Sequence, residues 1–286
     1  MISVRLEGRL GNQLFQYAFI YNASKKLNTS FYLDKSVDCL LLDKYFDIEN
    51  DFCWCFDKYI FSIKGFKNIF SHHLKYKFYG LLKSLFSLKE VNVDNYADPV
   101  TKVGSISNNT IYSGFFQSEQ YFKEISGEIY SIFNVKDIYK TEFETVIRNS
   151  GIADKYVVIH IRRKDYIDLG FALDYEYFHR AIKSIHKEEN YYVFISDEPD
   201  DIEQRFNYIK HKYISYQSEI IDFQFINYAA TCILSNSSFS WWGAYLNQNK
   251  PYIIAPKYWF GFKELKEIPV GVAPENFKLI SVSDNN

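Results

Sequence analysis

Residues 157–167 read VVIHIRRKDYI, an apolar and largely β-branched run that leads directly into charged residues. Such a run predicts a strand over residues 156–162 that is buried on both faces, as in parallel sheets. Three adjacent cations occupy positions 162–164, where this strand ends. Cations at the tip of a buried strand indicate an anionic ligand there, with Asp165 beside it.

The chain that follows alternates between helical and extended patterns. It predicts strands over residues 191–196, 232–235 and 252–255, and helices over residues 175–187, 202–209, 219–229 and 241–249. Alternation of this kind, with nearly continuous apolar strands, indicates a parallel sheet covered by helices on both faces.

The N-terminal half has the same order of elements. Gly8 and Gly11 are expected to bracket a tight turn. The other elements predicted there are strands over residues 2–6, 31–34 and 111–117, and helices over residues 12–27, 70–91 and 119–149. The rest of residues 39–105 shows no clear period. We therefore expect an α/β protein with two doubly wound domains, one on each side of about residue 150, and a cleft between them.

Composition narrows the class of protein. Hydrophobic residues make up 47% of the 286 positions, which is typical of a globular protein. A net charge of −2 argues against a nucleic-acid binder. The four cysteines, Cys39, Cys53, Cys55 and Cys232, follow no zinc or redox spacing and suit a reducing compartment. Without a signal sequence or an apolar run of 18 residues, we expect a cytoplasmic protein.

Four polar clusters fall at predicted strand ends, where parallel sheets bind ligands. They cover residues 8–13, 160–165, 196–200 and 236–240. An arginine fork fits phosphate oxygens with two hydrogen bonds of ~1.5–3 kcal/mol each, so Arg162 or Arg163 can hold a diphosphate. Adjacent strand residues face opposite sides, so one arginine is expected to contact the ligand while the other braces the loop.

The segment 236–240, NSSFS, opens a helix directly after a strand, and backbone N–H groups at a helix start bind anions. Three hydroxyls and an amide exceed what capping requires. The sequence has no D-x-D triplet and no His, Asp or Glu cluster with metal-ligand spacing. Arginine and helix N-termini are therefore expected to stabilise a departing diphosphate, with neither metal nor cofactor.

Three motifs in this order resemble those of the family 11 glycosyltransferases, the inverting, GDP-fucose-dependent α-1,2-fucosyltransferases. They are GRLGNQLFQYA at residues 8–18, HIRRKDY at residues 160–166, and NSSFSWWGAYLN at residues 236–247 followed by APKYWF at residues 255–260. The resemblance implies a GT-B-like fold of two Rossmann-like domains with parallel sheets facing a central cleft. It places the acceptor mainly on residues 1–153 and GDP-fucose on residues 154–286.

The resemblance also implies roles for single residues. Arg162 would hold the β-phosphate with support from Arg163, and Asp197 would lie near guanine or ribose. The remaining donor contacts would come from Gly11, Asn12, Asn236, Ser237, Ser238, Phe239 and Ser240. Lys164 departs from the glycine that the family usually has at this position, which leaves the local backbone geometry open.

An inverting transfer needs a base that takes the proton of the acceptor hydroxyl. Asp165 is our first choice, and its alternative role is a salt bridge that holds Arg162 or Arg163. Asp168, Glu176 and Glu7 are further candidates for the base. His160 is expected to orient the catalytic loop, and Trp241 and Trp242 to shape the sugar pocket or fill the core.

The expected activity is transfer of L-fucose to the 2-hydroxyl of a terminal galactose in an oligosaccharide or O-antigen. A fucosyltransferase of another linkage and a non-catalytic nucleotide-sugar or glycan-binding protein are the alternatives. The expected partners are GDP-fucose and the galactose-terminated glycan, at the inner face of the membrane. Residues 58–89, with their lysines and aromatic residues, form either a loose membrane contact or a solvated face.

Overall fold

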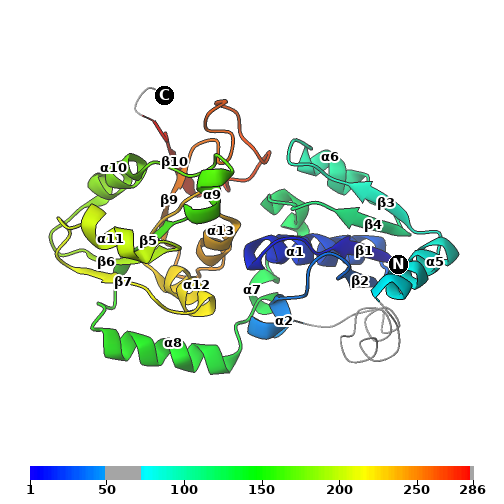
Figure 1. Cartoon of the computed structure of the whole chain (residues 1–286), viewed down its shortest axis with the longest axis horizontal. Helices are drawn as coiled ribbons and strands as arrows, with labels where there is room; N and C mark the ends of the chain where they lie inside the picture. The colour runs from blue at the N-terminus through cyan, green and yellow to red at the C-terminus, as the bar shows by residue number, and fades with distance from the viewer. Residues whose placement is uncertain (49–71, 284–286) are drawn as a thin grey trace. The chain divides into compact units, whose positions relative to one another are not determined.

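The computed structural model describes residues 1–48 and 72–283, and its chain divides into two compact α/β units (Figure 1). The N-terminal unit covers Met1–Asn134 and the C-terminal unit Val135–Asn286. Each unit has one parallel sheet, as the sequence predicts.

The N-terminal sheet has the strand order β2-β1-β4-β3. Its strands are β1 (Ile2–Arg5), β2 (Phe31–Asp34), β3 (Lys89–Asn92) and β4 (Thr110–Ser113). Helix α1 (Leu10–Leu27) packs on the face that carries Phe31 and Tyr112, where Phe19 meets Tyr112 edge to face at 5.3 Å. Helix α5 (His72–Leu85) covers the opposite face through Tyr79, which clusters with Tyr32 and Ile111. The shorter helices of this unit are α2 (Leu42–Tyr45), α6 (Pro99–Gly104), η2 (Glu119–Tyr121), η3 (Lys123–Ile125) and α7 (Ile129–Ile132).

The C-terminal sheet has six parallel strands in the order β7-β6-β5-β8-β9-β10, which is the strand order of a dinucleotide-binding fold. The strands are β5 (Tyr156–Ile161), β6 (Tyr191–Ser196), β7 (Lys212–Ile214), β8 (Thr231–Ile233), β9 (Tyr252–Pro256) and β10 (Phe277–Ile280). The helices are α8 (Asp137–Ser150), α9 (Lys164–Asp168), α10 (Tyr175–Ile185), α11 (Pro199–Arg205), α12 (Glu219–Tyr228) and α13 (Ser238–Tyr245).

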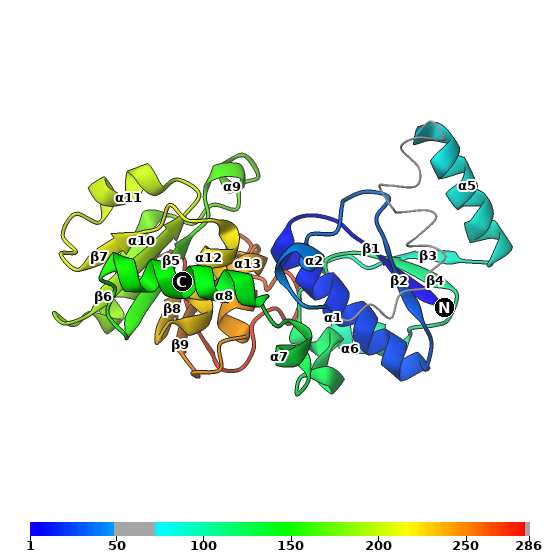
Figure 2. The same cartoon turned by 90° about the horizontal axis from the view of Figure 1, so that it is seen from below.

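Alternate residues of β5 face two different helix layers, because successive strand side chains point to opposite faces. Val157, Ile159 and Ile161 pack in one core cluster with the buried sides of α10 and α11. On the other face, Tyr156 donates a hydrogen bond to the carbonyl oxygen of Phe225 in α12. The helices on both sides of the sheet are visible in Figure 2. Burial on both sides explains why β5 is apolar along nearly its whole length.

The N-terminal compact unit ends at Asn134, because α8 packs with the C-terminal unit. The ring of Phe143 lies 5.1 Å from that of Phe225, and Gln224 donates a hydrogen bond to the carbonyl oxygen of Tyr139. The amphipathic helix α8 thus covers α12, and Gly151 ends it in a left-handed conformation with φ of 66°.

Several element boundaries differ from the predicted ones. Helix α1 begins at Leu10, so Gly11 lies inside its first turn and only Gly8 adopts a positive φ, of 81°. Strand β4 ends at Ser113, because Gly114 has a φ of 144° that interrupts the strand. Helix α11 begins at Pro199, a residue suited to the first helical position. The sequence did not predict α2, α6, α9, β7 and β10, and the helix predicted over residues 70–91 ends at Leu85 and is followed by strand β3.

The cysteines behave as ordinary thiols where the structure describes them. Cys39 is exposed and Cys232 is buried, and burial raises the pKa of the Cys232 thiol. Cys53 and Cys55 lie outside the described residues, as does the part of the expected membrane contact at residues 58–71. Across residues 1–48 and 72–283, no helix has both the length and the apolar character needed to cross a membrane.

Candidate functional site

The switch point of the C-terminal sheet lies between β5 and β8, where the strand order reverses. Ligands of open α/β sheets bind outside the carboxyl ends of the strands at this point. The chain leaves β5 through Arg162 and Arg163 and leaves β8 through the residues that start α13. Two of the predicted polar clusters, residues 160–165 and 236–240, therefore lie at the carboxyl ends of adjacent strands of one sheet.

His160 joins these two strands from inside the protein. Its Nδ1 atom lies 2.9 Å from Oγ of Ser235, and its ring is 5.7 Å from that of Phe239. Burial, together with the nearby charge of Arg162, lowers the pKa of His160 to about 3. A neutral, buried imidazole fits the expected orienting role, and Ser235 is a partner that the sequence reading did not identify.

We expect His160 to make folding stability depend on pH. Its pKa lies below the unfolded value of 6.5, so the unfolded chain takes up a proton first as the pH falls. Stability is therefore complete above pH 6.5 and declines below it. Between pH 7 and 5, urea unfolding of the wild type should lose about 2 kcal/mol more than that of His160→Asn.

The control for this measurement is His211→Gln, which removes an exposed imidazole. It should retain the pH dependence of the wild type. Equal pH slopes for His160→Asn and the wild type would show that His160 is not held neutral in the folded protein.

Arg162 is held by two carboxylates. Its Nη2 atom lies 2.7 Å from Oδ1 of Asp165, and its Nε atom lies 3.3 Å from Oδ2 of Asp197. The Arg162 side chain is 18% exposed and that of Asp165 46% exposed, so the guanidinium is largely enclosed while its Asp165 partner is open to solvent. The salt bridge weighed as one role of Asp165 is thus present.

Asp197 connects β6 to the start of α9. One carboxylate oxygen accepts the backbone N–H of Arg163 at 3.0 Å, and the other accepts that of Lys164 at 3.1 Å. With the contact to Arg162, three donors from the loop after β5 surround this carboxylate. Its described contacts therefore belong to the loop that holds Arg162.

The side chain of Arg163 contacts the chain after α9, whereas that of Arg162 contacts Asp165 and Asp197. It donates a hydrogen bond to the carbonyl oxygen of Leu173, and its guanidinium carbon lies 4.5 Å from the ring centre of Tyr175. Lys164 starts α9 and is not among the described residues with positive φ. Replacement of the family glycine by Lys164 thus requires no unusual backbone conformation.

The segment before α13 is packed closely against the loop after β5. Asn236 is fully buried and donates from Nδ2 to the carbonyl oxygen of Phe171 at 2.9 Å, while its Oδ1 atom has no hydrogen-bond partner among the described residues. The hydroxyl of Tyr166 donates to the carbonyl oxygen of Asn236, and burial raises the pKa of Tyr166 to about 12. Tyr166 is a second contact that the sequence reading missed.

The serines of this segment are distributed around the first turn of α13. Ser237 is buried at the N-cap and makes no side-chain cap hydrogen bond. The buried hydroxyl of Ser240 donates to the carbonyl oxygen of Ser237, while Ser238 and Phe239 are half-buried. An uncapped helix start can bind an anion through its backbone N–H groups, whereas Oδ1 of Asn236 can only accept a hydrogen bond, as from a sugar hydroxyl.

Trp241 and Trp242 belong to the core. Both are fully buried, and Nε1 of Trp241 donates to the carbonyl oxygen of Val272 at 2.7 Å. At Gly243, a Cβ atom would come within 2.8 Å of Cβ of Ile226, so glycine allows α13 to approach α12 closely. Of the two roles expected for the tryptophans, core filling is the one that the structure shows.

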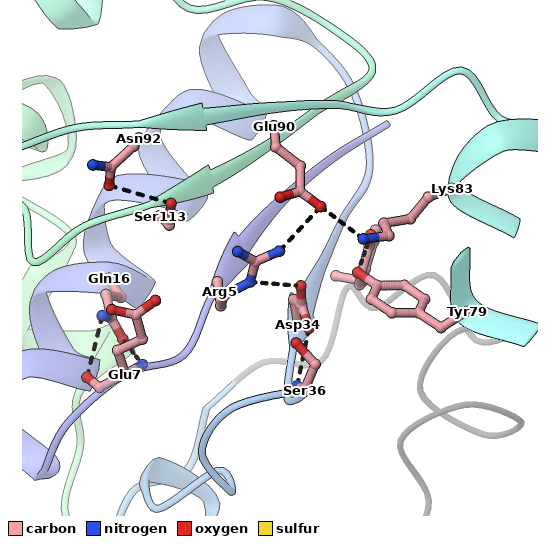
Figure 3. Close-up of polar contacts among 11 residues, drawn as sticks. Arg5, Glu7, Gln16, Asp34, Ser36, Tyr79, Lys83, Glu90, Asn92 and Ser113 are labelled. Atoms are coloured by element: carbon pink, nitrogen blue, oxygen red, sulfur yellow. Dashed lines mark hydrogen bonds and ion pairs between the residues drawn. The ribbon is translucent and has the colours of Figure 1, made fainter. Parts of the chain in front are cut away.

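In the N-terminal unit, side-chain amides fix the loop after β1. Gln16 donates to the carbonyl oxygen of Glu7 and accepts its N–H, both at 3.2 Å, so the Glu7 peptide is held on both sides (Figure 3). Gln13 donates to the carbonyl oxygens of Gly8 and Cys39. Oδ1 of Asn12 accepts a hydrogen bond from Gln117 at 2.9 Å. The predicted site residues Gly11 and Asn12 thus form part of a rigid helix start.

The other candidate bases occupy separate positions. Asp168 lies in the last turn of the short α9, and Glu176 in the first turn of α10, while Glu7 follows β1. Within the described parts of the chain, no three His, Cys, Asp or Glu side chains are grouped closely enough to hold a metal ion.

Comparison with known proteins identifies relatives over nearly the full length. The family model "Glycosyl transferase family 11" matches residues 1–267. An Escherichia coli alpha-1,2-colitosyltransferase is 31% identical, over 93% of this chain and 94% of the relative. The E. coli O-antigen biosynthesis glycosyltransferase WbnK is 27% identical, over 89% of this chain and 93% of the relative.

Among solved structures, fucosyltransferase NodZ from Bradyrhizobium is similar, with a TM-score of 0.53, 13% identity, and coverage of 85% of this chain and 92% of NodZ. Another NodZ structure, of the alpha-1,6-fucosyltransferase soaked with GDP-fucose, has the same TM-score. At this identity the likeness concerns the fold, which is the GT-B arrangement of two Rossmann-like α/β units expected from the sequence motifs.

Proposed function

This chain belongs to glycosyltransferase family 11, and from that membership we propose that it transfers L-fucose from GDP-fucose to the 2-hydroxyl of a terminal galactose. The proposed acceptor is an oligosaccharide or O-antigen chain, since one relative is an O-antigen biosynthesis glycosyltransferase. The observation that carries the proposal is the largely enclosed guanidinium of Arg162, which lies where the β5 strand ends at the switch point.

In this proposal the C-terminal unit binds the donor. Arg162 exchanges its pairing with Asp165 for the β-phosphate of GDP-fucose, because a guanidinium fork fits phosphate oxygens. Asp197 and Arg163 keep the loop in place during this exchange. Oδ1 of Asn236 would accept a hydrogen bond from a hydroxyl of the donor, and the backbone N–H groups at the start of α13 would donate to phosphate oxygens. The further donor contacts are assigned to Gly11, Asn12, Ser237, Ser238, Phe239 and Ser240.

The proposed reaction is a single displacement. The acceptor oxygen forms a bond to C1 of fucose while the bond from C1 to the β-phosphate oxygen breaks, so the anomeric configuration inverts. Asp165 takes the proton of the acceptor hydroxyl, and its exposure leaves it open to an acceptor. Arg162 and the N-terminus of α13 neutralise the departing GDP, so the proposed step uses neither a metal ion nor a cofactor. His160 orients the loop without exchanging a proton.

A second candidate donor differs only in its sugar. The relative with 31% identity is an alpha-1,2-colitosyltransferase, and colitose is the 3-deoxy analogue of fucose. A transferase that held the fucose 3-hydroxyl by hydrogen bonds would reject colitose strongly, whereas an apolar contact at C3 would accept it. The preference between GDP-fucose and GDP-colitose therefore shows whether polar or apolar groups of the protein surround C3 of the donor sugar.

The test mixes the purified protein with GDP-fucose or GDP-colitose and a panel of galactose-terminated and galactose-free acceptors, with and without EDTA. GDP release and the linkage of the product are followed. We expect GDP-fucose to be consumed in EDTA and the product to carry an α-1,2 bond to galactose.

Other outcomes separate the alternatives. A product with another linkage would retain the donor assignment and overturn the acceptor position. Preference for GDP-colitose would assign the second donor. Donor binding without turnover on any acceptor would favour a binding protein, and loss of turnover in EDTA would contradict the metal-free step.

A further inference from the structure

Helix α5 has one covered face, which fixes it on the N-terminal sheet. The hydroxyls of Tyr79 and Tyr32 lie 3.0 Å apart, and Lys83 pairs with Glu90 of β3 at 2.7 Å. Arg5 of β1 reaches the same carboxylate at 3.2 Å (Figure 3). The orientation of the helix about its axis is therefore determined, and so is the set of side chains that it turns outward.

A second face of α5 is apolar and uncovered. Phe78, Leu81 and Leu85 are 45%, 65% and 73% exposed. Their spacing of three and then four residues places them on one side of the helix. Single exposed apolar residues are normal on protein surfaces, but an aligned set on one helix marks an interaction surface. We call these three residues the outer face of α5.

The surroundings of the outer face are basic. Residues 72–89 contain four lysines and no acidic residue, whereas the other 29 basic and 35 acidic residues of the chain give a net charge of −6. Lys77 and Lys89 are exposed near the two ends of the described part of this segment. Of these lysines, Lys83 is paired with Glu90, so the exposed Lys77 and Lys89 are the cations that the described part of this segment offers on either side of the outer face in the sequence.

We propose that the outer face of α5 binds the surface of an anionic lipid membrane, with the helix axis parallel to that surface. Leucine and phenylalanine would enter the boundary between head groups and acyl chains, while lysines contact the anionic head groups. A second copy of the chain is less well matched. Pairing of two such helices would bring their lysines together, and neither copy supplies an acidic residue from this segment.

This surface does not depend on the donor or acceptor proposed above. It would hold the enzyme at a membrane, where a lipid-linked glycan is available. The sequence left two roles open for residues 58–89, a loose membrane contact and a solvated face. The proposal assigns the membrane contact to the outer face of α5 and keeps the solvated face as the alternative.

The test is sedimentation of the full chain with vesicles of phosphatidylglycerol and phosphatidylethanolamine, compared with pure phosphatidylcholine. The wild type should bind the anionic vesicles and release from them as salt is added. Replacing two leucines, Leu81→Ser with Leu85→Ser, should weaken binding at least about tenfold without changing the charge. Lys77→Gln with Lys89→Gln should weaken binding to anionic vesicles by a similar factor.

The matched control is Val100→Ser with Ile138→Ser, which removes two apolar side chains that are 64% and 71% exposed elsewhere. It should bind within twofold of the wild type. Absence of binding to anionic vesicles, or equal losses in control and leucine variants, would overturn the proposal. A wild-type dimer that the leucine variant dissociates would assign the face to self-association. Because the readout is sedimentation, it is independent of transfer activity.

Discussion

Arg162→Ala is expected to lower kcat/KM for sugar transfer by about three orders of magnitude. The variant removes the largely enclosed guanidinium that is assigned to the phosphate in the proposed function, so the negative charge of the departing diphosphate would lose its main partner. Arg162→Lys should recover only part of the loss, because an ammonium keeps the charge but lacks the planar fork. Initial rates and the Kd for GDP would be measured together.

The control is Arg205→Ala, which removes a guanidinium of α11 that lies 4.2 Å from the ring centre of Tyr175. Its kcat/KM should stay within a few-fold of the wild type. If Arg162→Ala retained GDP affinity and more than a tenth of the activity, the diphosphate would have to bind elsewhere.

Asp165→Asn is expected to lower kcat by about three orders of magnitude while changing the Kd for GDP-fucose by only a few-fold. An amide has almost the same shape as the carboxylate but cannot accept the proton of the acceptor hydroxyl. The conserved shape should keep Arg162 near its place, because Asp197 still contacts Nε of Arg162.

The two roles of Asp165 give different kinetic patterns. If Asp165 served only to hold Arg162, Asp165→Asn would lose donor affinity. Asp165→Ala combined with Arg162→Ala would then lower activity no further than Arg162→Ala alone. Asp168→Asn, in the last turn of the same short helix α9, is the matched control and should remain active. An active Asp165→Asn would direct attention to Glu7 or Glu176.

Long, periodic elements could be predicted from the sequence, and so could the buried edge strand β2, whereas three other short edge strands could not. Helix α12 and strand β6 were predicted to within a residue, because the helix has a largely apolar sequence over ten residues and the strand is a run of aromatic and β-branched residues. Strands β3, β7 and β10 lie at sheet edges and have only three or four residues. Each of these strands has a neighbour on one side only and is partly exposed, so few of its residues need to be apolar and its sequence shows little hydrophobic pattern. Helix α8 belongs to the C-terminal unit through the contact between Phe143 and Phe225, which is not visible in the local sequence.

Strand-end positions of the site could be inferred from the motifs, but the partners of the side chains could not. The sequence places His160 and Asn236 near strand ends, and the structure adds that His160 meets Ser235 and that Asn236 contacts Phe171. The contact of Asp197 with the N–H groups of Arg163 and Lys164 joins residues more than thirty positions apart. Such long-range pairings depend on the fold and have no local signal.

The order of strands in the C-terminal sheet also constrains how the site is assembled during folding. Residue Val157 pairs with Tyr192 on one side, about 35 positions away, and with Thr231 on the other side, about 75 positions away. Closing the longer loop costs more chain entropy, so the pairing of β5 with β8 is expected to form later in folding than that of β5 with β6. Because His160 and Ser235 face each other across this longer-range pairing, we expect refolding protein to form the proposed donor site only after β8 has paired with β5.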